Sequence, residues 1–298
     1  MSHFVARLAL ASALLLAGTA AWAQSKPHAQ ASATHPATAP PVQDDDDEAT
    51  GLLSAALGYG NNSAFFGRTQ ATTYPYFTQE LTYTSKYGVW GSVYNYDLFD
   101  TGSHFDETDL SIGYDKDLTK KVDLSLAYSR FLYAPNSPLV KSAVNNSIDA
   151  ALGYDWGYIY TRLNGSYLFG TDAHDTFLVL DNSRAFDIDG VLTPKDYFTI
   201  TPKFSLVAGT QDFVQVSDAQ QVLRGNKKPK TKPGTAATTS TDATRFTLLS
   251  YGLRLPVAYT LGKVSAEVAY RYLQPVNVLP EDDSAGRSYF TATLTVTL

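Results

Sequence analysis

The last eleven residues, Ser288 to Leu298, read SYFTATLTVTL and alternate between apolar and polar side chains to the final position. One face holds Phe290, Ala292, Leu294, Val296 and Leu298, and the other holds Tyr289, Thr291, Thr293, Thr295 and Thr297. Successive side chains of a β-strand point to opposite faces, so this stretch predicts a strand with one apolar and one polar face. Terminal residues usually fray because they have few partners. We therefore expect this strand to pair along its length and to close a larger sheet.

The same alternation recurs from Gly51 onward, roughly every 15 to 25 residues, with polar or turn-forming stretches in between. The clearest apolar faces are Leu53-Ala55-Leu57-Tyr59, Thr108-Leu110-Ile112-Tyr114, Val122-Leu124-Leu126-Tyr128, Ile148-Ala150-Leu152-Tyr154 and Val264-Ala266-Val268-Tyr270-Tyr272. Aromatic residues at the ends of an apolar band are typical of a membrane interface. Tilted strands of about 10 residues can cross a bilayer, whereas strands of soluble proteins more often have about 5 or 6 residues. A soluble lipocalin-like barrel, the alternative, would turn its apolar face inward around a ligand.

Short and long connections alternate along most of the chain, as periplasmic turns and extracellular loops of a membrane barrel do. The short ones are Ser85 to Gly88, Lys116 to Lys121, Asp155 to Gly157 and Leu261 to Lys263. The long ones are Asn61 to Tyr74, Phe99 to Glu107, Tyr133 to Asn145, Gly209 to Thr244 and Gln274 to Arg287. The pattern is weakest from Phe169 to Asp196, where we expect a short outer loop, a strand near Asp175 to Asp187, and a turn. The sequence thus predicts an all-β fold, a transmembrane antiparallel up-and-down β-barrel of about 12 strands over residues 51–298.

The N-terminal region predicts export. His3 and Arg7 precede an apolar run from Leu8 to Leu16 and an Ala-Trp-Ala site at Ala21 to Ala23, so residues 1–23 resemble a cleaved signal peptide. The apolar run is too short for a membrane anchor. Residues 24–50, with the acidic run Asp44 to Glu48, have the composition of a disordered acidic periplasmic tail. The acidic run could bind calcium, but a solvated linker is the better interpretation.

Composition excludes several classes of function. The chain has no cysteine, which excludes a lipoprotein anchor, disulfides and thiolate metal sites. A formal net charge of −6 argues against nucleic acid as a partner. We expect location in the outer membrane of a Gram-negative cell. The expected partners are outer-membrane lipid, lipopolysaccharide, and the barrel-assembly machinery, which would bind the C-terminal strand. We expect no cofactor and no metal.

Several short segments resemble a known family. Tyr87-Gly88-Val89-Trp90-Gly91-Ser92 is similar to a Gly-x-Trp-x-Ser strand of TorF-type porins, as are Thr108 to Tyr114 and Val122 to Tyr133. The stretch Leu253 to Leu298 resembles small outer-membrane barrels of Bacteroidota. The resemblance implies an outer-membrane barrel and a pore, and it supplies no binding residue. The terminal Leu298 departs from the aromatic residue with which such barrels commonly end.

The inward positions of the predicted strands carry charge. If the apolar faces point to lipid, the inward side chains include Glu80, Asp109, Asp123 and Asp149 in the first half, and Arg162, Lys203, Arg254, Glu267 and Arg271 in the second. Acids would then line one wall and bases the other, with Glu267 as the main exception. Walls of charge are how pores select ions. The alternative is an internal network of ion pairs that plugs a closed barrel.

The predicted loop from Gly209 to Thr244 carries a basic patch of Arg224, Lys227, Lys228, Lys230 and Lys232. Five cations this close together create a local positive field. This field could hold lipopolysaccharide phosphates or attract anionic solutes. A flexible, solvated loop is the simpler interpretation.

Catalysis is the weakest of the three functions that we consider. The barrel portion holds only His104 and His174, both in predicted outer loops, and acid–base catalysis needs convergent groups that spacing alone does not establish. We therefore expect that the protein is not an enzyme. The favoured function is a small, passive, porin-like channel for hydrophilic solutes. The alternative is a non-conducting barrel that acts structurally or through its loops, and an outer-membrane hydrolase is third.

Overall fold

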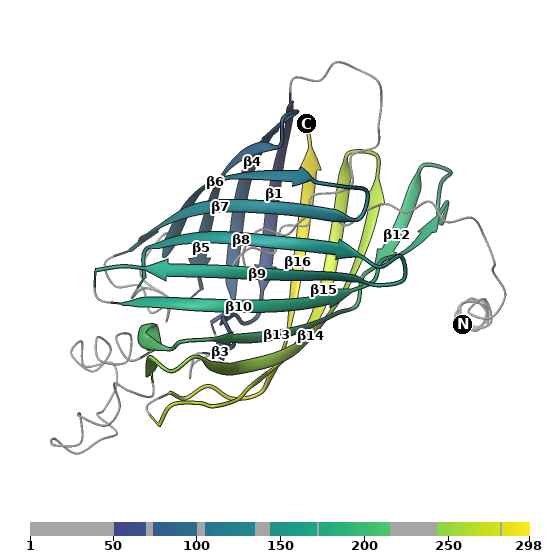
Figure 1. The fold of residues 1–298 in the computed structure, drawn as a ribbon. Helices are drawn as coiled ribbons and strands as arrows, with labels where there is room; N and C mark the ends of the chain where they lie inside the picture. Colours follow the sequence, from purple (N-terminus) through teal and green to yellow (C-terminus); the bar gives the residue numbers. More distant parts are fainter. Residues whose placement is uncertain are drawn as a thin grey trace, which may run out of the picture.

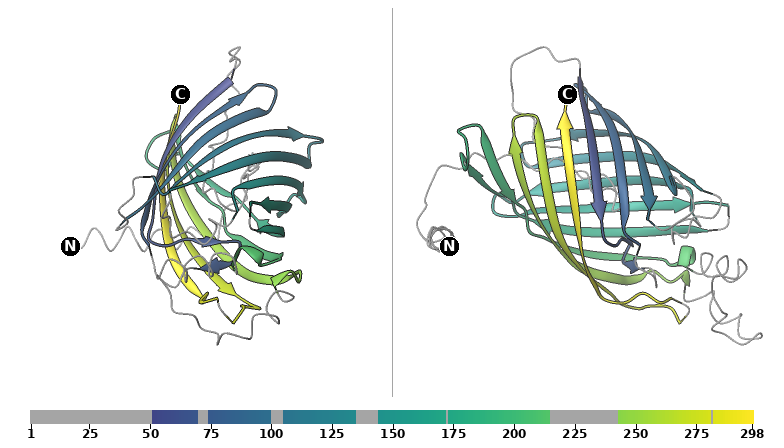
Figure 2. Two further views of the ribbon diagram at one scale, coloured as in Figure 1. Left: turned by 90° about the vertical axis from the view of Figure 1, so that its left-hand side faces the viewer. Right: turned by 180° about the vertical axis from the view of Figure 1, so that it is seen from behind.

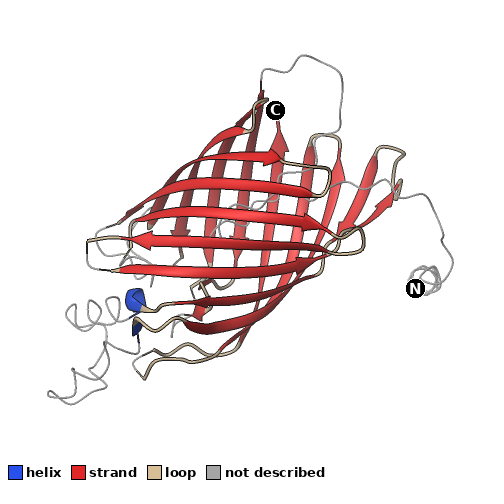
Figure 3. Cartoon of the chain, in the orientation of Figure 1, coloured by secondary structure: helices blue, strands red, loops and turns tan. Residues whose placement is uncertain are grey.

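A computed structural model describes residues 51–69, 74–99, 105–134, 144–171, 173–214, 243–280 and 282–298. Strands neighbouring in sequence pair in antiparallel fashion, and the sheet closes into a barrel of 12 strands (Figures 1 and 3). The predicted fold class is therefore confirmed. The proposed signal peptide and acidic tail lie outside the described residues.

The barrel strands follow one another around the ring in chain order. They are β1 (Gly51–Gly60), β4 (Tyr76–Ser85), β5 (Val89–Leu98), β6 (Glu107–Asp117), β7 (Val122–Tyr133), β8 (Asn146–Asp155), β9 (Tyr160–Phe169), β10 (His174–Ser183), β13 (Lys203–Gly209), β14 (Thr247–Leu261), β15 (Val264–Pro275) and β16 (Arg287–Thr297). Most have 10 to 12 residues, the length at which tilted strands span a bilayer.

The C-terminal strand closes the ring. Strand β16 pairs with β1 from Ser54↔Thr297 to Gly60↔Thr291, and the backbone N–H of Leu298 donates to the carbonyl of Leu53 at 2.8 Å. The C-terminus lies beside the start of β1 at one end of the barrel (Figure 2). The alternation of residues 288–298 thus corresponds to the seam strand that closes the barrel.

A short two-stranded hairpin extends the barrel wall at the end where the C-terminus lies. Strand β11 (Phe186–Asp189) follows β10, and β12 (Asp196–Ile200) precedes β13 and pairs with the C-terminal part of β14, Val257 to Leu261 (Figure 1). The Asp196 carboxylate accepts hydrogen bonds from the backbone N–H groups of Val191, Leu192 and Thr193. These bonds fix the turn between β11 and β12.

The outer surface of the barrel is apolar. Large side chains at alternate positions, such as Ile112, Leu152 and Val268, are more than half exposed, while their strand neighbours face the interior. The interior instead holds serine, threonine, tyrosine and charged side chains. This polarity matches a membrane barrel and opposes the lipocalin-like alternative. Among the described residues, no helix is long and apolar enough to span a membrane.

Candidate functional site in the lumen

Part of the first predicted outer loop folds into the barrel. Strands β2 (Ala64–Phe65) and β3 (Arg68–Thr69) form a small hairpin whose central residues, Phe66 and Gly67, have φ values of 42° and 85°. Positive φ at both central residues is the geometry of a tight hairpin turn, and a phenylalanine adopts it only where packing compensates for the strain. We call residues 64–69 the lumen hairpin.

Aromatic packing holds the lumen hairpin against a distant wall. Phe66 stacks on Phe177 of β10 with ring centroids 3.9 Å apart, and Phe65 meets Phe213 edge-on at 5.3 Å. The same buried cluster includes Leu168 of β9. In the ring of 12 strands, β9 lies six strands from β1 in either direction. The hairpin that follows β1 therefore reaches across the lumen toward the opposite wall.

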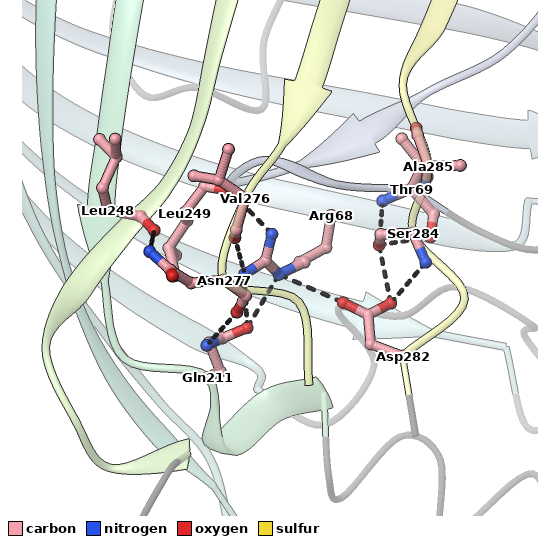
Figure 4. A network of polar contacts seen from close by, with 10 residues as sticks. All are labelled: Arg68, Thr69, Gln211, Leu248, Leu249, Val276, Asn277, Asp282, Ser284 and Ala285. Carbon is pink, nitrogen blue, oxygen red and sulfur yellow. Dashed lines mark hydrogen bonds and ion pairs between the residues drawn. The ribbon is translucent and has the colours of Figure 1, made fainter. Parts of the chain in front are cut away.

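Arg68 fixes the lumen hairpin through polar contacts (Figure 4). Its side chain is 1% exposed and donates hydrogen bonds to the Gln211 side chain at 2.9 and 2.6 Å, and to the carbonyls of Leu249, Val276 and Asn277. Its Nε also lies 3.2 Å from Oδ2 of Asp282. A buried guanidinium needs an opposite charge and several acceptors, and this site supplies both.

Two further contacts seat the hairpin. The backbone N–H of Thr69 donates to Oγ of Ser284, and Ser284 donates to the Thr69 carbonyl. A Cβ added to Gly67 would lie 2.3 Å from Oγ of Ser250 on β14. Only glycine permits this close approach together with the positive φ.

Asp175 holds the segment that receives Arg68. Its carboxylate accepts hydrogen bonds from the Thr210 hydroxyl at 2.7 Å and from the backbone N–H groups of Asp212 and Phe213, both at 2.8 Å. These bonds position a short helical turn at residues 212–214, next to Gln211. The alternation of the sequence did not identify Asp175 as an inward-facing charge.

A cavity of about 160 Å³ lies beneath the lumen hairpin. Ala64, Phe66 and Gly67 form part of its wall, and strands β9, β10 and β13 to β16 form the rest. Its charged lining residues are Arg162, Asp181, Lys203, Arg254 and Arg271. The cavity therefore gathers all four of the cations that the sequence placed on inward positions.

Three of these cations stand side by side. Lys203 is the direct cross-strand partner of Arg254, and Arg254 is the direct partner of Arg271. The next position in the same row is Tyr289 on β16. We call Lys203, Arg254 and Arg271 the basic row. Like charges at directly opposed positions destabilise a sheet, so this arrangement must be compensated.

Carboxylates compensate part of this charge. Lys203 Nζ lies 3.5 Å from Asp181, Arg254 is paired with Glu267, and Arg162 lies 3.2 Å from Asp123. Asp181 is a second inward acid that the sequence analysis missed. Because Asp175 and Asp181 lie between Arg162 and Lys203 in the ring, acids and bases are less cleanly divided between two walls than the sequence suggested.

The remaining acids lie on the opposite side of the lumen. Asp149 accepts hydrogen bonds from Ser147 and Ser166, and Glu80 accepts one from Thr82. Asp109 is fully buried and is the cross-strand neighbour of Tyr94 and Phe131. Strand register thus places all nine predicted charges on inward positions, where Glu80 and Asp149 bond to hydroxyl groups and Asp109 lies between two aromatic residues.

Other candidate residues are not joined to this site. The basic patch of Arg224, Lys227, Lys228, Lys230 and Lys232 lies outside the described residues, as does His104. His174 is exposed and is the first residue of β10. Within the described ranges, no group of three or more histidine, aspartate or glutamate side chains is placed to hold a metal ion.

Comparison with known proteins gives architecture only. No family model and no curated protein matches the chain. The specific resemblance to TorF-type porins is therefore not supported by a family match. Among solved structures, the chain is similar to the NanC porin (9% identity, TM-score 0.45, 83% of this chain and 100% of that chain). It is likewise similar to LpxR from Salmonella typhimurium (9%, 0.47, 82% and 99%) and to an outer membrane channel from Pseudomonas putida F1 (9%, 0.42, 86% and 100%). These neighbours are barrels of similar extent.

Proposed function

We propose that this protein is a passive outer-membrane channel for small hydrophilic solutes, narrowed by the lumen hairpin. The observation that carries the proposal is the charged cavity beneath the hairpin, inside a closed barrel with an apolar exterior. Polar and charged side chains stay solvated only where water enters. Burial of such a group without a hydrogen-bond partner would cost about 1–3 kcal/mol for a neutral group and more for a charge. A wetted, charge-lined lumen is the arrangement through which hydrophilic solutes pass in membrane barrels.

The outer-membrane location belongs to this proposal. The apolar exterior of Ile112, Leu152 and Val268, the even number of strands and the short turns at one end all support it. The resemblance of Tyr87 to Ser92 and of Thr108 to Tyr114 to TorF-type porins agrees with it. These residues lie in or next to β5 and β6, in the wall and not in the lumen hairpin.

The test is a liposome-swelling assay with the purified mature protein and uncharged solutes of increasing size, from glycerol through a pentose to a trisaccharide. A narrowed channel admits the small solutes and excludes the trisaccharide, and protein-free liposomes give the background rate. If no solute enters faster than this background, the passive-channel proposal fails.

One observation favours the second candidate, a non-conducting barrel. Phe65, Phe66, Phe177 and Phe213 form an apolar cluster across the outer part of the lumen, and such a cluster excludes water. A barrel plugged in this way would act through its loops or its outer surface. The Arg68→Ala variant separates the two candidates, because a channel narrowed by the hairpin widens when the hairpin is released. If other side chains also close the lumen, the wild type and the Arg68→Ala variant both remain non-conducting.

A further inference from the structure

We propose that the cavity beneath the lumen hairpin is a binding site for one small organic monocarboxylate, with the basic row as its recognition element. This inference deepens the proposed function, because it names the class of solute that the lumen favours. It follows from the charge balance, the hydrogen-bonding capacity and the size of the cavity.

The charge balance leaves one positive charge. The basic row contributes three cations, and two carboxylates, Asp181 and Glu267, act on it. Glu267 acts on Arg271 but is already paired with Arg254. Among the described residues, Arg271 also lies opposite Tyr289 on β16 and near Tyr76, whose phenol groups are uncharged near neutral pH. Arg162 adds no excess, because it is paired with Asp123. One monoanion would therefore neutralise the site.

The hydrogen-bonding capacity points to the same ligand. The Nε atoms of Arg162, Arg254 and Arg271 are buried and make no hydrogen bond within the described part of the chain. A guanidinium presents its N–H groups as a planar fork that matches a carboxylate, and such charge-assisted pairs are about twice as strong as neutral hydrogen bonds. A bound carboxylate would also offset the repulsion between neighbouring cations in the basic row.

The cavity limits the size and the character of the ligand. The accessible volume of about 160 Å³ is roughly ten times the ~10–15 Å³ that one water molecule needs, so a small organic ligand fits. Beyond the cations, its wall offers the polar side chains of Asn164 and Ser205, interleaved with the apolar side chains of Val179, Val207 and Phe66. A short hydroxy acid, with a carboxylate at one end and a small, partly apolar body, matches this lining.

The binding test uses lactate and its uncharged amide, lactamide, which differ in charge but hardly in shape. Titration calorimetry of the mature protein in detergent micelles should show lactate binding and no lactamide binding. Arg271→Gln removes the uncompensated cation and should weaken lactate binding by about tenfold, whereas Arg271→Lys, which keeps the charge but loses the planar fork, should weaken it less. Arg130→Gln makes the same charge change on an exposed side chain of β7 and should leave lactate binding unchanged.

Three results would overturn the inference: equal binding of lactate and lactamide, equal heats from chloride at the same ionic strength, or unaltered binding in Arg271→Gln. The melting curve of each variant shows whether it has kept the barrel fold. If Arg271→Gln does not fold, Arg271→Lys and the comparison of lactate with lactamide still decide the question.

A second measurement separates this inference from the proposed function. In planar bilayers under a potassium lactate gradient, a conducting wild type should prefer lactate over potassium, and Arg271→Gln should lower the permeability ratio at least about twofold. If the wild type binds lactate but carries no current, the binding site stands and the channel proposal fails. If the wild type conducts small solutes without binding lactate, the channel proposal stands and the binding site fails.

Discussion

Nη2 of Arg68 lies 2.6 Å from Oε1 of Gln211, a residue 143 positions further along the chain. This bond ties the segment after β1 to the segment after β13, and both are tied in turn to the connection between β15 and β16 through Asn277 and Asp282. The lumen hairpin is therefore anchored to two separate connections, β13–β14 and β15–β16, at the end of the barrel away from the C-terminus. Its position in the lumen depends on side chains of these connections and of β10.

The Arg68 anchor gives the first prediction. Arg68→Ala removes one buried charge and its hydrogen bonds and leaves Asp282 without its cation, at a local cost of about 3–5 kcal/mol. The barrel ladders do not depend on Arg68, so the fold should persist while the hairpin leaves its seat. Single-channel conductance should rise about twofold. Arg130→Ala, at an exposed arginine, is the control and should conduct like the wild type. An Arg68→Ala channel of unchanged conductance would show that the hairpin does not restrict the lumen.

Gly67 gives a prediction with an internal control. Gly67→Ala places a Cβ 2.3 Å from the Ser250 hydroxyl at a φ of 85°, so it combines a steric clash with backbone strain. Gly157→Ala adds the same methyl group at a φ of 91°, with no heavy atom within 4 Å. Both variants carry backbone strain of about 1 kcal/mol, but only Gly67→Ala should displace the hairpin. Proteolysis of folded protein should therefore cut near Arg68 in Gly67→Ala and not in Gly157→Ala. The same cleavage in both variants would contradict the close fit at Ser250.

The seam between β1 and β16 predicts how the barrel fails. The mature protein should run faster on unheated gels than on boiled ones, because a closed barrel has no edge from which to unzip. Even-numbered residues of β16 turn their backbone N–H groups to β1, as Leu298 does to Leu53. Ala292→Pro removes such a seam N–H opposite Tyr59 and should abolish the fast-running form, whereas Ala292→Ser keeps this N–H and should preserve it. An Ala292→Pro protein that still shows the heat-dependent shift would mean that the β1–β16 seam is not needed for closure.

The pair of Asp123 and Arg162 predicts non-additive stability. Their side chains are 19% and 6% exposed and 3.2 Å apart, so removal of one leaves a largely buried charge. Arg162→Gln alone should cost about 1–3 kcal/mol in urea unfolding of the folded barrel. Adding Asp123→Asn should recover part of this loss. If the two losses simply add, the pair contributes nothing beyond its individual side chains.

The alternation of the sequence was sufficient to predict the barrel and the inward cations. Period-two segments such as residues 288–298 specify which face of each strand is apolar. The inward direction of Lys203, Arg254 and Arg271 follows, because these residues alternate with the apolar positions of their strands. Their side-by-side arrangement does not, because register depends on turn geometry and bulges, such as the shift between Val207 and Ala208.

The inward acids of β10 were missed for a physical reason. Phe177 and Val179 face the lumen and pack on the hairpin, while Leu178 and Leu180 face outward, so the strand is apolar on both faces. A strand of this kind has no period-two signal, and Asp175 and Asp181 could not be assigned to a face.

The lumen hairpin was also missed, although one signal was available. The segment Phe65-Phe66-Gly67-Arg68 lies in a loop that was predicted to face water, where two adjacent phenylalanines are unfavourable by about 1.5–3 kcal/mol each. Such a pair next to a turn-forming glycine indicates a loop that folds onto an apolar surface. The sequence does not specify that surface, since Phe177 and Phe213 are more than a hundred residues away.

The most direct test of the account is single-channel recording of the mature protein and of a variant in which residues 62–69 are replaced by a short glycine–serine linker. We expect discrete conductance steps for the wild type and larger steps for the variant, because removal of the lumen hairpin widens the path over the basic row. A wild type and a variant that both remain silent, although both show the heat-dependent gel shift of a folded barrel, would contradict it.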